Sequence, residues 1–192
     1  IRVSLVGSEM CIRDRVMTPC DRNSSRSLTK KLLDHPKPSY TRTARNKTRE
    51  IYTKEEAEAL EIGKASVLRE GADASIIACG VMVERALEAA DRLAERGVEA
   101  AVIDMHTIKP IDREAIIRAA SSGAIVTAED HSVIGGLGSA VAEVLAEEAP
   151  TMMRMIGVRD KFGESGSPSD IMDKMGLTSE NIASKVEDLL SK

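Results

Sequence analysis

From residue 62 onward, short apolar runs alternate with longer stretches whose apolar side chains recur at helical spacing. Uninterrupted apolar runs bounded by Gly, Asp or Pro are typical of strands that are buried on both faces. They predict strands at residues 74–80, 98–105, 123–130 and 151–158.

The stretches between these runs have the pattern of amphipathic helices. After the first strand, apolar residues from Val83 onward recur on one face, charged residues lie opposite, and Gly97 ends the pattern. Three later helices begin with side chains that cap helix N-termini well, namely Asp112, Ser167 and Thr178. We therefore expect helices at residues 81–97, 112–122, 138–148, 168–175 and 179–190.

Strands that alternate with helices of this length indicate βαβ units. The predicted fold class is α/β, a three-layer α/β/α arrangement around a mostly parallel sheet, with right-handed crossovers. Aromatic residues make up only 2% of the chain and Trp is absent, so the core has to be built from Ala, Val, Ile, Leu and Met.

The chain before residue 54 has a different character. Residues 24–35, SSRSLTKKLLDH, read as one helix, and residues 38–45, PSYTRTAR, read as one strand. We interpret this as too little to bury a core. The predicted organisation is a tail and linker at residues 16–53, followed by one domain at residues 54–192.

The first fifteen residues, IRVSLVGSEMCIRDR, contain too many charges for a secretory signal. Residues 5–15 can be back-translated in one frame into a sequencing-library adapter that ends in a transposase mosaic end. We expect residues 1–15 to be translated adapter and the remainder to be a carboxy-terminal fragment. A transit peptide is the alternative that this composition leaves open.

Charge is divided unevenly along the 192 residues: residues 1–54 carry +8 and residues 55–192 carry −12. A basic arm can bind nucleic acid, but no groove-reading motif follows it, so a solvated or interface segment is favoured. No window is apolar enough to cross a membrane. Cys11, Cys20 and Cys79 form no CxxC pair, which favours a reducing, cytoplasmic location, and the histidines lack metal-ligand spacing.

Four stretches together identify a family. They are HTIKPID (106–112), TAEDHSVIGGLGSAVAEVLAE (127–147), GVRDKFGESG (157–166) and GLTSENI (176–182). From residue 16 to the end, the chain resembles the carboxy-terminal domain of the transketolase family, closest to the small subunit of split, two-subunit transketolases. Under this resemblance, residues 16–45 are similar to the last helix and strand of the family's pyrimidine-binding domain.

The resemblance implies transfer of a two-carbon ketol unit between sugar phosphates, as in the pentose phosphate pathway. It implies thiamine diphosphate and a divalent metal in the complete enzyme, held between an N-terminal subunit and the pyrimidine-binding domain. It also implies a second copy of this subunit as a partner. Because the cofactor-binding regions of the family lie upstream of residue 16, we expect this chain alone to bind no cofactor and to be inactive. We assign it no catalytic residue and no metal ligand.

Three alternatives remain open at this point. A deoxyxylulose-phosphate synthase and the β subunit of a 2-oxoacid dehydrogenase belong to the same wider family. A non-catalytic α/β interaction module is the alternative from a different class.

The resemblance places Arg45 at the position where the family holds the substrate's phosphate, and a guanidinium group suits that anion. Arg42 is the weaker candidate, because the odd spacing puts it on the opposite face of an extended strand. Glu164, in FGESG, is expected to be an interface or capping acid.

Other candidates lie at strand ends, where α/β sheets present ligands. His106 and His131 each follow a predicted strand and could lie at the periphery of an active site. Gly135 and Gly136 precede a helix whose N-terminus could receive an anion. The GGxGS pattern is neither a dinucleotide nor a P-loop motif, so we favour tight strand-to-helix packing.

Overall fold

The computed structural model describes residues 14–35 and 38–191, and residues 1–13, to which most of the adapter prediction applies, lie outside them. Within the described residues, a central five-stranded sheet has the order β3-β5-β4-β7-β8. Its strands are β3 (Ser66–Arg69), β4 (Ala74–Ala78), β5 (Ala100–Asp104), β7 (Ala124–Ser132) and β8 (Met152–Val158). The four predicted strands are therefore confirmed, with shifts of one or two residues at most ends.

The sheet is mostly parallel, as the sequence predicts. β5, β4, β7 and β8 run parallel to one another. β3 was not predicted, and it pairs antiparallel with β5, opposite Asp104 at Ser66. It escapes detection because it has only four residues and one charged side chain within its short apolar pattern.

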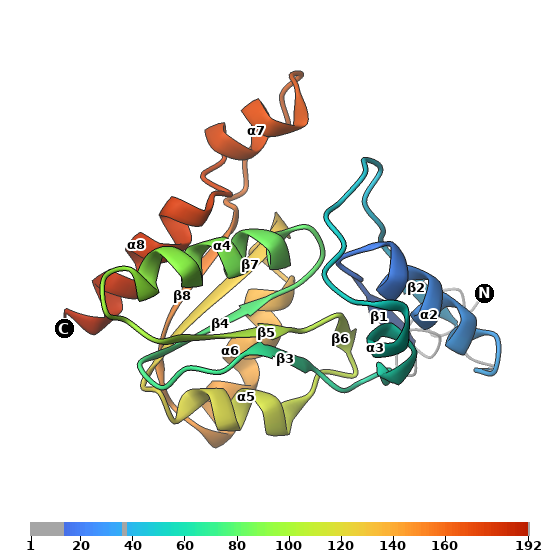
Figure 1. The fold of residues 1–192 in the computed structure, drawn as a ribbon, viewed down its shortest axis with the longest axis horizontal. Helices are drawn as coiled ribbons and strands as arrows, with labels where there is room; N and C mark the ends of the chain where they lie inside the picture. Colours follow the sequence, from blue (N-terminus) through green and yellow to red (C-terminus); the bar gives the residue numbers. More distant parts are fainter. Residues whose placement is uncertain (1–13, 36–37, 192) are drawn as a thin grey trace, which may run out of the picture.

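Helices cover both faces of this sheet and give the expected three layers (Figure 1). α4 (Met82–Ala94) and α8 (Ser179–Leu190) lie on one face, and α5 (Arg113–Ala120) and α6 (Leu137–Glu148) lie on the other. α7 (Pro168–Lys174) projects away from the layers. Asp112, Ser167 and Thr178 cap their helices as predicted.

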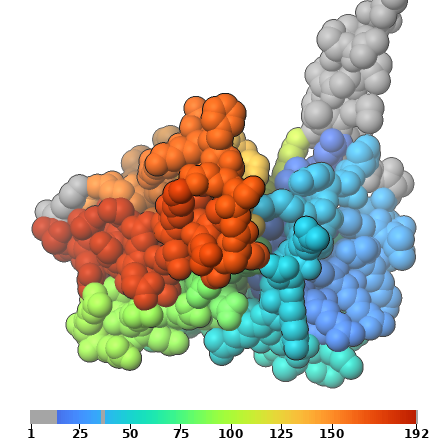
Figure 2. Space-filling model, turned by 90° about the horizontal axis from the view of Figure 1, so that it is seen from above, coloured from blue at the N-terminus to red at the C-terminus, as the bar shows by residue number. Residues whose placement is uncertain are grey.

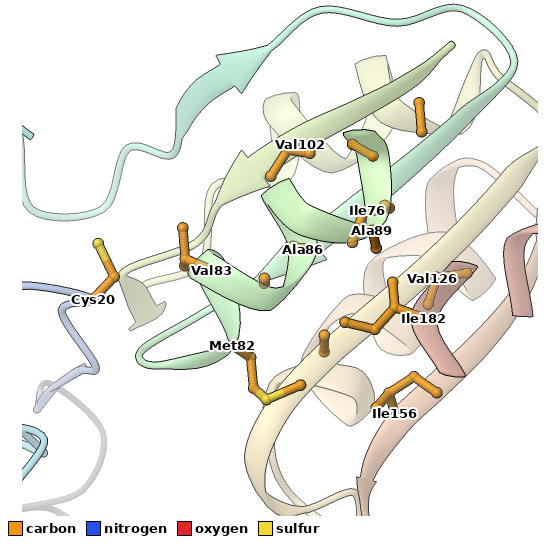
Figure 3. Packing of buried hydrophobic residues seen from close by; sticks show 14 of the residues in the cluster. Cys20, Ile76, Met82, Val83, Ala86, Ala89, Val102, Val126, Ile156 and Ile182 are labelled. Carbon is orange, nitrogen blue, oxygen red and sulfur yellow. The ribbon is translucent and has the colours of Figure 1, made fainter. Parts of the chain in front are cut away.

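Small side chains let α4 approach the sheet closely. Figure 3 shows Val83, Ala86 and Ala89 of α4 beside the sheet residues Ile76 and Val102, and all five are fully buried. An alanine at the contact brings a helix backbone nearer to a sheet than a larger residue does. The core thus reaches dense packing almost without aromatic residues.

The segment before residue 54 packs against the main domain, and its buried residues share the core of that domain. β1 (Arg15–Met17) lies between β2 (Ser39–Thr41) and β6 (Thr107–Lys109) of the main domain. Met17 and Leu28 are fully buried in the core that also contains α4. Two helices complete the segment and the junction after it, α2 (Arg22–Leu32) and α3 (Lys54–Ala59). β6 belongs to the HTIKPID motif, which therefore holds the two parts together.

None of the helices in the described part of the chain is long and apolar enough to span a membrane.

Candidate functional site

A narrow cleft of ≈ 160 Å³ lies where the segment before residue 54 meets the end of β7 and the start of α6. β1, β2 and β6 supply one wall, and the loop between β7 and α6 supplies the other. The second wall carries the side chains of Glu129 and His131, and the first carries Val16, Tyr40 and Ile108. Its place at the carboxyl end of parallel strands is the usual ligand side of such a sheet.

Arg42 is the cation that the structure brings to this cleft. Its Nη2 donates to Oδ1 of Asp130 over 2.6 Å, and its Nη1 donates to the Asp130 carbonyl oxygen over 3.0 Å. Both side chains are less than one-third exposed, at 28% and 29%. Sequence reasoning ranked Arg42 low and did not pair it with Asp130, because nothing in the sequence shows that β2 ends beside β7.

Glu129 closes the N-terminus of α6. Its two carboxylate oxygens accept hydrogen bonds from the backbone N–H groups of Leu137 and Gly138, each over 2.8 Å. Burial raises the pKa of Glu129, and these two N–H donors act against that shift. The carboxylate thus takes the place that a bound anion would occupy at this helix end.

The glycines of the GGLGS turn serve this close packing, as the sequence favoured. A Cβ atom on Gly136 would lie only 2.0 Å from Oε2 of Glu129. Gly135 has open space around it but a φ of +72°, which favours glycine. The open anion site that Gly135 and Gly136 could have formed is therefore filled by the protein itself.

The two histidine candidates lie in different environments. His131 lines the cleft, its side chain is 52% exposed, and its Nδ1 lies 3.0 Å from the Ser132 carbonyl oxygen. His106 is fully buried outside the cleft lining, with Nδ1 2.9 Å from Oγ1 of Thr107. Burial, with a smaller contribution from Lys31, lowers the pKa of His106 to about 4. His106 is thus a neutral core histidine, and His131 is the one that can meet a ligand.

Arg45 and Glu164 lie away from this cleft. Arg45 is exposed and lines a second, wider hollow of ≈ 580 Å³ between the 44–48 loop, α4 and α7. Figure 2 shows this loop, in cyan, beside the orange segment that leads into α7. Glu164 is exposed in that segment and forms an ion pair with Lys174. The structure therefore separates Arg45 from His131, while Arg42 joins His131.

A diphosphate cofactor with its metal needs an open anion site and oxygen ligands for the cation. Within residues 14–35 and 38–191, no three His, Cys, Asp or Glu side chains gather as a metal site. The helix start that the sequence offered to an anion is already filled by Glu129. The start of α6 is therefore not an open site for a diphosphate.

Sequence comparison gives the family. A model of the family described as "Transketolase, C-terminal domain" matches residues 63–182, which is more than half of the chain. The chain belongs to this family. The match includes β3 to β8, the wall of the cleft at the end of β7 and the start of α6, and the start of α8, whereas β1 and β2 precede it.

Members of the transketolase family include longer relatives of this chain. A 6-deoxy-6-sulfo-D-fructose transketolase subunit, SqwH, from Clostridium sp. (strain MSTE9) is 46% identical over 87% of this chain and 52% of its own length. A 1-deoxy-D-xylulose-5-phosphate synthase 1 from Geobacter sulfurreducens is 39% identical over 92% of this chain and 28% of its own length. The chain spans about half the length of the transketolase subunits that it matches.

A solved structure agrees with these relatives. The structure of a "Split gene transketolase, inactive beta4 tetramer" superposes with a TM-score of 0.89 at 44% identity, over 93% of this chain and 58% of that one. The superposition covers most of the described residues, so the α/β/α fold and its mostly parallel sheet are those of a transketolase subunit.

Proposed function

We propose that this chain works as part of the smaller subunit of a two-subunit transketolase. The complete enzyme transfers a two-carbon ketol unit between a ketose phosphate and an aldose phosphate. The observation that carries the proposal is the superposition on a split transketolase over 93% of the chain at 44% identity. Its two free cysteines in the described part, Cys20 and Cys79, are buried and unpaired, which agrees with a cytoplasmic enzyme.

In this proposal, thiamine diphosphate and its divalent metal are bound outside the residues described above, with the help of an N-terminal subunit and a second copy of this subunit. The cofactor supplies the carbanion chemistry of ketol transfer. This chain contributes assembly surface, and alone it does not turn over substrate.

Arg45 is the proposed ligand for a substrate phosphate. Its side chain is exposed at the wide hollow, which Lys47 and Lys161 also line. Among the described residues it has no acidic partner, whereas Arg42 is already paired with Asp130. A free guanidinium group can donate two parallel hydrogen bonds to a phosphate. Arg42 has fewer N–H donors left, and Asp130 already offsets its charge.

The test uses this chain, restored to its full subunit, together with its N-terminal partner subunit and thiamine diphosphate. We expect ketol transfer to ribose 5-phosphate. Activity only with pyruvate would instead support a deoxyxylulose-phosphate synthase or a 2-oxoacid dehydrogenase. No activity with either substrate would favour the non-catalytic interaction module.

Three variants test the assignment of the phosphate ligand. Losing a charged hydrogen bond costs roughly 1.5–3 kcal/mol, so Arg45→Gln should raise the KM for sugar phosphates by about 10- to 100-fold. Arg49→Gln is the matched control, because Arg49 is also exposed in the same loop but does not line the hollow. A larger effect from Arg42→Gln than from Arg45→Gln would move the phosphate site into the narrow cleft.

A further inference from the structure

A buried carboxyl group joins the segment before residue 54 to the main domain. Asp104 ends β5 and is fully buried. Its Oδ2 accepts a hydrogen bond from the Tyr52 hydroxyl over 2.8 Å and one from the Cys20 thiol over 3.6 Å. Both donors come from the earlier segment and are themselves buried, at 6% and 3% exposure. A single oxygen atom therefore connects two parts of the chain that lie far apart in sequence.

The other oxygen of this carboxyl group, Oδ1, is buried without a hydrogen-bond partner in the described structure. An ionised carboxylate needs several donors to offset the loss of water. Asp104 has two, and one of them is a weak thiol donor. The negative form is therefore poorly stabilised as long as the segment remains in place.

We propose that Asp104 is a proton-dependent clasp, which holds residues 14–35 and 38–53 against the domain while its carboxyl group is protonated and releases them when the proton is lost. Ionisation favours an open form in which water reaches the carboxylate. Release would widen the junction that also forms the narrow cleft, because Thr18 lines that cleft and bonds from the early segment to the main domain at two points. The Thr18 N–H donates to the His106 carbonyl oxygen over 2.8 Å, and the Gly80 N–H donates to the Thr18 carbonyl oxygen over 3.0 Å.

Asp104 changes charge near neutral pH, whereas the two groups that donate hydrogen bonds to it do not. Burial, followed by the proximity of Asp104, raises the pKa of both Tyr52 and Cys20, so these donors keep their protons. The pKa of Cys79, after β4, is raised well above its usual range, first by its own burial. The neighbouring strands place Ser66 and Ala78 opposite Asp104, and neither is titratable.

Asp21 is an acidic group near Asp104, and its negative charge disfavours a second negative charge on Asp104. The Asp21 carboxylate accepts hydrogen bonds from the N–H groups of Ser24, Ile51 and Tyr52 and from the Ser24 hydroxyl. Burial raises the pKa of Asp104 to about 7, the Tyr52 and Cys20 hydrogen bonds lower it, and Asp21 raises it. The group thus titrates near the pH of a cell.

The direction of the effect follows from linkage. The pKa of Asp104 in the closed form, about 7, lies above that of a solvated aspartate, so protons favour the closed form. This stabilisation is complete below the solvated pKa of about 4 and is lost as the pH rises through 7. The equilibrium constant for opening should then increase about tenfold for each pH unit between about 4 and 7, and level off once the pH has passed 7.

Amide hydrogen exchange on the whole chain tests whether the clasp opens as the pH rises. The measured exchange rates are corrected for the intrinsic pH dependence of exchange. The reporters are the N–H groups of Thr18 and Gly80, which cross the junction, and the reference is the N–H group of Ile125 in the central strand β7. We expect the reporters to be less protected than Ile125 and to lose about tenfold in protection between pH 6 and pH 8. Constant protection, or protection equal to that of Ile125, would overturn the clasp.

Variants separate the clasp from general stability. Asp104→Asn keeps an oxygen acceptor but cannot ionise, so reporter protection should no longer change with pH. Asp112→Asn is the matched control, because Asp112 is also buried and caps α5, and it should keep the tenfold change. An Asp104→Asn chain with the wild-type pH dependence would refute the proposal.

If Asp104→Asn does not fold, the wild-type chain still decides the matter. The ¹³C shift of the Asp104 carboxyl carbon then gives its titration midpoint directly. The midpoint of the loss of reporter protection should agree with it, and a difference of more than about one pH unit overturns the clasp.

Discussion

Gly136 provides the sharpest test of how the β7–α6 turn is built, because it has ordinary backbone angles and no room for a side chain. In Gly136→Ala, the new Cβ would lie 2.0 Å from Oε2 of Glu129 and 2.5 Å from the Ser132 carbonyl oxygen. No stable contact of this kind exists, so the Glu129 carboxylate has to move. Moving it breaks its hydrogen bonds to the N–H groups of Leu137 and Gly138.

The size of the effect follows from those two bonds. Each hydrogen bond to a buried charged group contributes roughly 1.5–3 kcal/mol, so Gly136→Ala should lower the free energy of unfolding by about 3–6 kcal/mol. In Gly135→Ala, the φ of +72° is unfavourable but the space is open. That change should cost only about 1–2 kcal/mol. Adjacent glycines thus differ because one lacks room and the other needs an unusual backbone angle.

Chemical denaturation of the two variants beside the wild type measures both costs. Thermal denaturation should show a drop of about 6–24 °C for Gly136→Ala and of about 2–8 °C for Gly135→Ala. The reasoning is refuted if Gly136→Ala is no more destabilising than Gly135→Ala. A further control is Gly136→Ala in a Glu129→Ala background, where the added cost should fall because the 2.0 Å contact no longer exists.

Three more predictions concern the contacts around the junction and the surface. Tyr52→Phe removes a hydrogen bond that lowers the pKa of Asp104, so this pKa should rise above 7. A fall in the pKa, measured by carboxyl ¹³C NMR, would contradict the role given to the Tyr52 hydrogen bond. Arg42→Gln breaks an ion pair whose side chains are 28% and 29% exposed, so the free energy of unfolding should fall by no more than about 1 kcal/mol. A larger fall on urea unfolding would show that the pair has a larger role. Phe162→Ser changes a side chain that is 97% exposed, so stability should stay within about 0.5 kcal/mol. If Phe162 is instead covered in an oligomer, sedimentation of the variant will show smaller particles.

The alternation of apolar runs and amphipathic stretches was enough to predict the domain from residue 74 to residue 190. Buried parallel strands have to be apolar throughout, and helices packed on a sheet have to be apolar on one face, so both patterns are written in the order of residues. The caps at Asp112, Ser167 and Thr178 are equally local, since each side chain bonds to an N–H group three residues later. β1, β3 and β6 were missed because strands of three or four residues carry too little pattern.

Contacts between distant segments were decided only by the tertiary structure. Arg42 meets Asp130 and Tyr52 meets Asp104 across 88 and 52 residues, and no spacing in the sequence indicates either pair. The sequence identified the GGLGS turn but not that Glu129 fills it, because the folding of the turn brings the carboxylate to the helix N-terminus. A residue's type is local information. Its partner, its burial and therefore its charge depend on which chain segments the fold places around it.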